Sequence, residues 1–319
     1  MTAMRAALHD EYGAPHVIYD GALPLPDVGV HDSLVRVSAT TVNGGDLLMR
    51  SGRLKVITGK KFPRQLGVDF VGDVVRTGAG VNGFQSGDRV WGVLAPGSTI
   101  GTAAEYVAVP SRRLSAAPGD LDPAEAASLL AGGTTALVGL RDQAKLRPGE
   151  RLFVRGAAGG VGSVAIQVGK YFGAHVTALA RSSQEAALYA LGADVVVDYR
   201  KTPTADLGTY DVVFDTRGTE LAALRRRLSP SGRMVTIAFD EAHPVSSFGF
   251  MGASIVFGRR RVRFFSGRPT RQLLEELRDL AGAGSIRPVI HSTYPLSHMP
   301  TAHSALESGG VFGKIVVHP

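Results

Sequence analysis

The hydrophobic residues of this chain follow different patterns along its length. Up to about residue 123, apolar and polar positions alternate in short runs broken by Gly and Pro, as in SLVRVSATTV and AAEYVAVP. This alternation is typical of half-buried strands and predicts a small, irregular β-rich domain. From about 124 to 267, short continuous apolar runs such as RLFVRG and DVVFDT alternate with helical patterns. Helices that connect apolar strands predict a doubly wound parallel sheet.

The end of the chain returns to the first pattern. PTRQLLEELRDLAGAG places leucines at helical spacing, and RPVIHSTYPL and GKIVVHP are typical of short strands. We therefore expect an α/β protein in which a parallel-sheet domain, 124–267, is inserted into a β-rich domain made of 1–123 and 268–319. A chain of 319 residues is long enough to form two hydrophobic cores.

A glycine-rich turn lies in the middle of the chain, within RLFVRGAAGGVGSVAIQ. The run from Ala157 to Gly162 reads A-x-G-x-x-G between a predicted strand and a helix that begins near Val161, as in a dinucleotide-binding fingerprint. Its backbone amides at the helix start are suited to a pyrophosphate, and Gly162 allows close packing of helix on strand. The predicted pyrophosphate contacts are Ala158, Gly159, Gly160 and Val161.

The residue at the end of the next strand selects between the two nicotinamide dinucleotides. NAD sites usually carry Asp or Glu there, about 20 residues past the glycines. This chain has Arg181 and Ser182. Arginine forms charge-assisted hydrogen bonds with a 2′-phosphate, worth about 1.5–3 kcal/mol each, and a serine hydroxyl adds a donor. The sequence therefore favours NADP(H) over NAD(H).

Composition excludes several classes of protein. The chain is 44% hydrophobic and 20% charged, which is typical of a globular protein, and it has no apolar run long enough for a membrane span. The N-terminus lacks the pattern of a secretory signal, so we expect a cytoplasmic protein. Because there is no cysteine, disulfides and zinc sites with sulfur ligands are excluded.

Basic residues are in excess. The net charge is +7, and arginines cluster at 225–227 and 259–261. A nucleic-acid face is one interpretation of such clusters. No helix-turn-helix pattern or platform of aromatic and basic residues accompanies them, so we expect no nucleic-acid partner and no membrane partner.

Several motifs, taken together, link the chain to a known family. VNGGDLLMRSG, FPRQLGVDFVGDVVRTGAGVNGFQSGDRVWG, AGGTTAL, GAAGGVGSVAIQ and LGADVVVDYR follow one another in family order. They resemble the zinc-independent medium-chain dehydrogenases/reductases of the quinone oxidoreductase (zeta-crystallin-like) group, over essentially the whole length. The resemblance implies a GroES-like catalytic domain interrupted by a Rossmann domain, which accounts for the mid-chain glycine loop. It also implies a homodimer in which the strand RVRFFS pairs across a two-fold axis.

The same resemblance implies a reaction without zinc. Zinc-dependent relatives have Gly-His-Glu where this chain has Gly67-Val68-Asp69, and they need cysteine ligands. His298 and His303 remain as a possible metal pair. No third ligand lies near them in the sequence, so we expect both to be surface histidines.

Individual contacts are also implied by the resemblance. Asn43 resembles a residue near the nicotinamide and the substrate and is the catalytic candidate, with a turn cap as its alternative. The other implied cofactor contacts are Thr134, Tyr199 beside the 2′-phosphate, the strand ends Thr216, Ala238, Phe239, Phe265 and Ser266, and Lys314. Structural alternatives stay open: a helix hydroxyl for Thr134, a packed ring for Tyr199 and a surface position for Lys314.

The expected reaction is hydride transfer from NADPH to a small molecule, with the protein supplying orientation and electrostatics. Without a metal to polarise an unactivated carbonyl, we expect a quinone or an α,β-unsaturated carbonyl as the acceptor, because the charge of the incoming hydride spreads into an enolate or quinol. Backbone amides and Asn43 are expected to hydrogen-bond the carbonyl oxygen.

The proton donor is the open part of this expectation. Leu54 stands where many relatives have a tyrosine that is a candidate acid, so protonation by water is the simpler hypothesis. Leu54, Ile57 and Phe62 are expected to form an apolar pocket wall, with core packing as the alternative. Asp46 is a second candidate acid, for which we expect a loop-structuring role.

Two other classes of protein share part of this signature. A short-chain dehydrogenase needs an N-terminal glycine motif and Tyr-x-x-x-Lys, and none of the eight tyrosines is followed four positions later by lysine. A non-catalytic NADPH-binding scaffold, or a nucleic-acid-associated protein that uses the arginine clusters, shares the whole cofactor signature. Turnover distinguishes this last class from the reductase.

Overall fold

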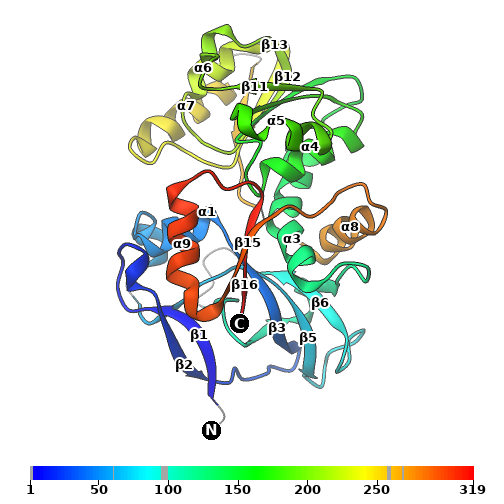
Figure 1. Cartoon of the computed structure of the whole chain (residues 1–319). Helices are drawn as coiled ribbons and strands as arrows, with labels where there is room; N and C mark the ends of the chain where they lie inside the picture. Colours follow the sequence, from blue (N-terminus) through cyan, green and yellow to red (C-terminus); the bar gives the residue numbers. More distant parts are fainter. Residues whose placement is uncertain (1–2, 60, 95–99, 257–259, 268) are drawn as a thin grey trace. The chain divides into compact units, whose positions relative to one another are not determined.

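The computed structural model describes residues 3–59, 61–94, 100–256, 260–267 and 269–319, apart from the side chains at 56–57 and 255–256. The chain divides into two compact units (Figure 1). Unit 1 comprises Met1–Ala131, Arg268–Ala283 and Pro288–Pro319, and unit 2 comprises Gly132–Gly267 and Gly284–Arg287. The predicted domains, 1–123, 124–267 and 268–319, place the first boundary a few residues earlier and stay a prediction.

Unit 1 is built on β-sheets. Its strands are β1 (Ala3–His9), β2 (Tyr19–Pro24), β3 (Asp32–Val42), β4 (Arg64–Gln65), β5 (Asp69–Thr77), β6 (Arg89–Val93), β7 (Tyr106–Pro110), β8 (Leu114–Ala116), β15 (Ile290–Pro295) and β16 (Lys314–His318). Its helices are α1 (Gly44–Arg50), α2 (Lys55–Thr58), α8 (Arg271–Gly282), α9 (Met299–Ser308) and most of α3 (Pro123–Leu137). The order in the larger sheet is β15-β16-β3-β5-β6-β8, with β7 also paired to β3, and a smaller sheet has the order β2-β1-β4.

The long strand β3 organises unit 1. It pairs antiparallel with β5, with β7 and, near its end, with β16 from the C-terminus of the chain (Figure 1). Apolar side chains of β3, β5, β6 and β7 form a buried cluster that includes Val35, Phe70, Val90 and Val107. Because β3 is held on both sides, the residues at its end lie in a rigid setting beside the first residue of β16.

Unit 2 contains a six-stranded parallel sheet. Its strands are β9 (Arg151–Arg155), β10 (His175–Ala180), β11 (Val195–Asp198), β12 (Tyr210–Asp215), β13 (Leu228–Thr236) and β14 (Val262–Phe264). Its helices are α4 (Gly162–Tyr171), α5 (Glu185–Ala190), α6 (Leu221–Arg226) and α7 (Pro244–Val256), and a π-helical turn (Val138–Gln143) continues α3. The order β11-β10-β9-β12-β13-β14 is that of a Rossmann sheet and confirms the predicted fold class.

The central position of β9 in the sheet explains why its sequence lacks an alternation of apolar and polar residues. Leu152, Phe153 and Val154 are all fully buried, as expected for a parallel strand whose two faces are both covered. Helix α4 packs on β9 and β10 with its own apolar side chains, among them Val164 and Val168. The glycine loop therefore lies at the carboxyl end of the first strand of the sheet, where such folds bind their ligands.

Candidate functional site

A buried polar cluster lies in unit 1, at the end of β3. It consists of Thr41 on β3, Asn43 just before α1, Asp46 on α1, Asp69 at the start of β5 and Lys314 at the start of β16, and we call these five residues the Lys314 cluster. Pairing of β3 with β5 and β16 brings together residues that are far apart in the sequence. All but Asn43, which is half-buried, are buried.

Lys314 holds the centre of the cluster. Its Nζ donates to Thr41 Oγ1 at 2.9 Å and to Asn43 Oδ1, and it lies 3.9 Å from Asp69 Oδ2. Thr41 Oγ1 in turn donates to Asp69 Oδ2 at 2.6 Å, and the Thr41 amide donates to Asp69 Oδ1 at 3.0 Å. The surface position left open for Lys314 is wrong, since the residue is 5% exposed.

The carboxamide of Asn43 has a fixed orientation. An ammonium only donates, so Oδ1 is the atom that faces Lys314. On its other side Nδ2 donates to the Thr41 carbonyl oxygen at 3.2 Å and lies 3.3–3.5 Å from Thr41 Oγ1 and Asp69 Oδ2. Exchanging the two amide atoms would place donor against donor and acceptor against acceptor. The cluster thus presents one rigid, half-exposed amide.

Asp46 holds the turn that precedes α1. Its Oδ2 accepts the backbone N–H of Asn43 at 2.8 Å, which agrees with the predicted loop-structuring role. Its Oδ1 is buried and has no hydrogen-bond partner among the described residues. Burial, together with the nearby Asp69 carboxylate, raises the pKa of Asp46 to about 7, against the opposing effects of Asn43 and Lys314. The carboxyl group is therefore partly protonated at neutral pH.

The pocket wall expected from Leu54, Ile57 and Phe62 stays a prediction. Phe62 packs edge-on against Tyr12 and His9, with ring centroids 5.1 and 5.6 Å apart. Leu54 is half-buried just before α2 and accepts a hydrogen bond from the Thr58 amide. Ile57 lies on α2, and its side chain is outside the described part of the structure. Packing within unit 1 thus explains Phe62.

His303 is buried, and the expectation of a surface histidine there is wrong. It lies on α9, is fully buried, and has no partner at either ring nitrogen among the described residues. Burial, with the charge of Arg50 and of His9, lowers the pKa of His303 to about 3. The apolar stripe of α9 carries this ring into the core, a placement that the pattern around Pro300 did not indicate. His298 is exposed, as expected.

The glycine loop of unit 2 has the geometry of a dinucleotide site. A Cβ at Gly162 would lie 2.1 Å from the Gly156 carbonyl oxygen, so only glycine fits where α4 meets the loop. A Cβ at Gly159 would meet nothing closer than 3.5 Å, so this face of the loop is open. Gly132 of α3 is equally constrained, because a Cβ there would lie 2.1 Å from the Gly160 oxygen. The open backbone at Gly159 and the amides at the start of α4 therefore fit a pyrophosphate.

Arg181 and Tyr199 lie together at the ends of adjacent strands β10 and β11. Arg181 Nε donates to Tyr199 Oη at 2.9 Å, and this bond lowers the pKa of Tyr199. The Ser182 amide donates to Asp198 Oδ2 at 3.4 Å. Tyr199 is 46% exposed, so its alternative role as a packed ring is wrong. The half-buried Arg181 side chain, aligned by a phenol, fits a phosphate monoester.

The carboxyl ends of the other strands form a second buried network. Thr216 Oγ1 donates to the Arg155 carbonyl oxygen at 3.0 Å, and Thr236 Oγ1 links Asp215 with the Ala238 carbonyl oxygen. Burial raises the pKa of Asp215, although the Arg155 guanidinium opposes the shift. Sequence reasoning missed Arg155 and Asp215, for which the only signal was a charged residue at the end of an apolar strand.

The remaining predicted contacts divide into buried and exposed positions. Thr134 is buried on α3, and Phe265 is buried over Gly139. Phe239 belongs to a group of three rings with Phe248 and Phe264, whose centroids are 5.2–6.3 Å apart. Ser266 is exposed.

Three arginines of the two clusters, Arg225, Arg227 and Arg260, donate to the protein's own backbone, and Arg259 lies outside the described residues. Arg225 Nε donates to the Arg260 carbonyl oxygen at 2.8 Å, Arg260 Nε to the Ser229 carbonyl oxygen at 3.2 Å, and Arg227 to two carbonyl oxygens in the segment before β12. Arg225 also stacks on Phe250. A structural role therefore accounts for much of these clusters.

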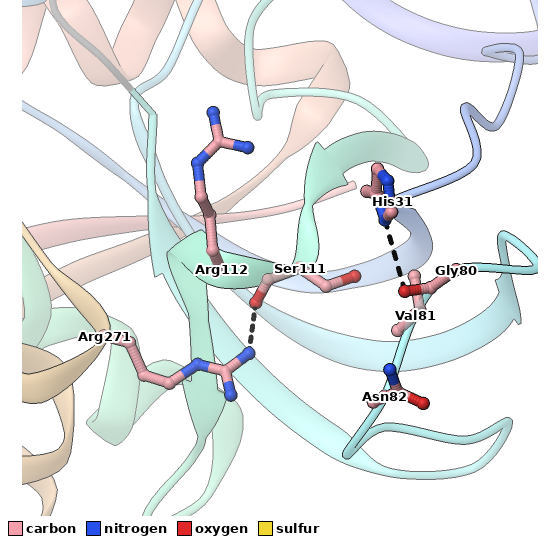
Figure 2. Close-up of a pocket in the computed structure, with 7 residues that line it drawn as sticks. All are labelled: His31, Gly80, Val81, Asn82, Ser111, Arg112 and Arg271. Carbon is pink, nitrogen blue, oxygen red and sulfur yellow. Dashed lines mark hydrogen bonds between the residues drawn. The ribbon is translucent and has the colours of Figure 1, made fainter.

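A separate hollow of about 510 Å³ lies in unit 1, between the loop at His31, the turn at Gly80 and the start of α8 (Figure 2). Arg271 Nη2 donates to the Ser111 carbonyl oxygen at 2.6 Å and its guanidinium stacks on Phe84. None of the predicted site residues lines it.

The described residues contain neither a metal site nor a membrane-spanning helix. In the ranges that the structure describes, no three His, Asp or Glu side chains are grouped so as to hold a metal ion. Likewise, no helix within these ranges has the length and apolar character needed to span a bilayer.

Comparison with known proteins agrees with this geometry. A family model described as alcohol dehydrogenase GroES-like domain matches residues 29–119, and one described as zinc-binding dehydrogenase matches residues 191–317. NAD(P)H oxidoreductase RTN4IP1, mitochondrial, of Mus musculus is 33% identical over 99% of this chain and 89% of its own length. The 2-methylene-furan-3-one reductase of Solanum lycopersicum is 32% identical, over 99% and 79%.

A third relative and one solved structure extend the comparison. The NADPH-dependent alkenal/one oxidoreductase, chloroplastic, of Arabidopsis thaliana is 31% identical over 99% of this chain and 80% of its own length. The quinone oxidoreductase from Coxiella burnetii superposes with a TM-score of 0.90 at 28% identity and covers 100% of both chains. The chain thus belongs to the quinone oxidoreductase group of the medium-chain dehydrogenase/reductase family and is an oxidoreductase that uses a nicotinamide cofactor.

Proposed function

We propose that this protein is an NADPH-dependent reductase of quinones or α,β-unsaturated carbonyl compounds that works without zinc. The observation that carries the proposal is the Lys314 cluster, which holds the Asn43 amide rigid beside a buried ammonium. One Nδ2 hydrogen of Asn43 is on the Thr41 carbonyl oxygen, and the other makes only the long contacts of 3.3 and 3.5 Å to Thr41 Oγ1 and Asp69 Oδ2. This second hydrogen is the one that would turn to a substrate carbonyl oxygen on which negative charge develops. The printed names of two relatives, a 2-methylene-furan-3-one reductase and an alkenal/one oxidoreductase, support the same class of acceptor.

The preference for NADPH rests on unit 2. The bound cofactor would supply the hydride, while the open loop at Gly159 and the start of α4 would hold its pyrophosphate. Arg181, aligned by Tyr199, would hold the 2′-phosphate, with Ser182 beside it. We further propose Thr134 as a contact to the nicotinamide-side phosphate. The proposed contacts to the ribose and nicotinamide are Thr216, Ala238, Phe239, Phe265 and Ser266.

The absence of zinc from the reaction is part of the proposal. Val68 replaces the histidine of the zinc-dependent pattern, and Asp69 is already engaged by Thr41 and Lys314. The positive charge of the Lys314 cluster is therefore that of the Lys314 ammonium, and no zinc ion is needed to supply one. The homodimer stays a prediction. The cytoplasmic location also stays a prediction, because the names of several relatives place those relatives in mitochondria or chloroplasts.

An acceptor screen tests this function. Purified protein, treated with a chelator, is mixed with NADPH or NADH and with a series of quinones, enones and saturated ketones, and nicotinamide oxidation is followed by absorbance. We expect turnover of conjugated acceptors with NADPH, and none with the saturated ketones. NADPH binding without turnover of any acceptor would instead favour a non-catalytic scaffold, and activity lost with the chelator would contradict zinc independence.

A further inference from the structure

One hydrogen of the Lys314 ammonium has no hydrogen-bond acceptor among the described residues. An ammonium carries three donors, and two of them reach Thr41 Oγ1 and Asn43 Oδ1. The carboxylate of Asp69 attracts the charge but lies at 3.9 Å from Nζ, beyond hydrogen-bond distance. Among the residues that the structure describes, no acceptor takes the third hydrogen. A buried donor without an acceptor is costly unless a ligand or water completes it.

The groups around Lys314 make this proton more acidic but leave it on Nζ. Thr41 faces the ammonium from β3, Asp69 from β5, and Asn43 with Asp46 from the start of α1. Burial lowers the pKa of Lys314, and the carboxylates of Asp69 and Asp46 oppose that shift. An ammonium with a lowered pKa is a better general acid at neutral pH than an ordinary lysine.

The proposed reaction needs such an acid for one class of acceptor. Hydride addition to the β-carbon of an enone leaves an enolate, which must gain a proton at the α-carbon. The position at which many relatives have a candidate tyrosine holds Leu54. We infer that Lys314 supplies this proton, an inference that rests on the proposed function. Asn43, its hydrogen-bond partner, marks where the substrate carbonyl would bind.

The step balances as an acid–base exchange. The new hydride–carbon bond at the β-carbon comes from the reduced nicotinamide, and the π electrons of the alkene pass into the enolate. One N–H bond of Lys314 then breaks as the α-carbon–hydrogen bond forms, and its electron pair stays on Nζ. The neutral amine regains a proton from solvent.

Two substrate classes separate a proton source from a positioning role. Reduction of a quinone ends with protons on oxygen, which water delivers quickly, whereas an enolate must be protonated on carbon. Lys314→Gln keeps donors for Thr41 and Asn43 but has no titratable proton. Because a general acid contributes about 10²–10⁴-fold, we expect the ratio of enone to quinone turnover to fall about 100-fold. Equal losses of turnover on the enone and the quinone would overturn the inference. Lys145→Met, which removes an exposed lysine, is the matched control and should keep the wild-type ratio.

Loss of the ammonium leaves the Asp69 carboxylate buried without its counter-charge, so Lys314→Gln alone can unfold the protein. The double variant Lys314→Gln/Asp69→Asn removes both charges at nearly constant volume, and thermal unfolding shows which variant is folded. The same fall in the enone-to-quinone ratio is expected in the folded one, and a wild-type ratio there would overturn the inference.

Two further readouts complete the test. In the cofactor-free protein, an NMR titration of ¹⁵N-labelled lysine should show Lys314 Nζ titrating below the ordinary 10.5, and a value at or above it counts against the inference. Wild-type protein that oxidises NADPH with neither substrate class would refute the proposed function itself, before any variant is made, and this inference with it.

Discussion

Arg181 is the residue on which cofactor choice depends in this account. Its side chain is half-buried and aligned by Tyr199, and one charge-assisted hydrogen bond is worth about 1.5–3 kcal/mol. We expect Arg181→Ala to weaken NADPH binding roughly 10- to 100-fold and NADH binding little, as measured by isothermal titration.

Two further variants, one expected to have a smaller effect and one expected to have none, accompany Arg181→Ala. Tyr199→Phe removes only the phenol that aligns Arg181, so a smaller loss in the same direction is expected. Arg278→Ala changes a half-buried arginine of α8, paired with its neighbour Asp279, and should leave both affinities as they are. Equal losses for NADPH and NADH in Arg181→Ala would remove the 2′-phosphate role.

His303 makes the free energy of unfolding depend on pH in the acid range. The unfolded chain protonates it near pH 6.5, while the folded protein resists protonation until about pH 3, because burial and the nearby Arg50 and His9 disfavour the cation. The unfolded state thus binds more protons between these values, and the contribution to stability, complete above pH 6.5, falls as the pH drops. The loss should approach about 1.4 kcal/mol per pH unit.

The variant His303→Leu tests this slope. Leucine has a similar volume and no proton to gain, so urea unfolding between pH 6.5 and pH 4 should show a shallower loss of unfolding free energy than in the wild type. Exposed His16→Leu serves as the control and should keep the wild-type slope. If His303→Leu keeps it as well, the buried imidazole is not its source.

At the scale of elements, the start of α4 separates packing from cofactor access. A Cβ at Gly162 would collide with the Gly156 carbonyl oxygen, whereas a Cβ at Gly159 would meet only ordinary contacts. We expect Gly162→Ala to lower the free energy of unfolding by about 3 kcal/mol or more, as overpacking does at tight contacts. Gly159→Ala should unfold close to the wild-type temperature and bind NADPH at least about tenfold more weakly.

Calorimetry and cofactor titration on the same two proteins check this contrast. The glycines differ by three positions in one loop, so each variant is the control for the other. A Gly159→Ala protein that binds NADPH as the wild type does would show that the pyrophosphate lies elsewhere.

The elements of this protein were predictable where burial dictates the residue types. The six parallel strands agree with their continuous apolar runs, and the amphipathic α8 agrees with the helical spacing of its buried leucines. Strands β2, β4 and β8 were not predicted: β2 is largely exposed and contains Gly21 and Pro24, and β4 and β8 have only two and three residues beside turns.

The candidate site was predictable to a smaller extent, and for a physical reason. Asn43, Arg181 and Lys314 were found from motifs that resemble those of the family. The partners that define their chemistry, above all Thr41 and Asp69, lie on strands brought together only by pairing of β3 with β5 and β16. The burial of His303 likewise depends on packing between distant segments, which no local pattern contains.

At the scale of the whole molecule, the expected homodimer depends on the edge of the parallel sheet. At the outer edge of β14, the Val262 N–H is already satisfied, because it donates to Ser254 Oγ at 2.9 Å. The Ser254 hydroxyl in turn donates to the Met251 carbonyl oxygen at 2.7 Å and lies 3.3 Å from the Val262 carbonyl oxygen. Since outward-facing residues alternate along a strand, the next outward backbone is that of Phe264. We therefore expect pairing of two β14 strands to depend on Phe264.

Light scattering measures this directly. The wild type should have twice the 33.5 kDa mass of one chain, and Phe264→Pro, which removes the outward N–H, should shift the protein to the monomer. Phe264→Leu keeps the N–H and should stay dimeric. A dimer that survives the proline would have its interface elsewhere, and a wild-type monomer would contradict the expectation.

Isotope tracing follows the hydride itself and so shows whether this protein reduces a conjugated carbonyl compound with NADPH. NADPH labelled with deuterium at C4, on each face in turn, is oxidised by the chelator-treated protein with an enone, and the product is analysed by NMR. We expect one deuterium at the β-carbon from a single face and none at the α-carbon, whose hydrogen comes from solvent through the protein. Label at the α-carbon, label lost to water, or no oxidation of NADPH by any conjugated acceptor would contradict this expectation.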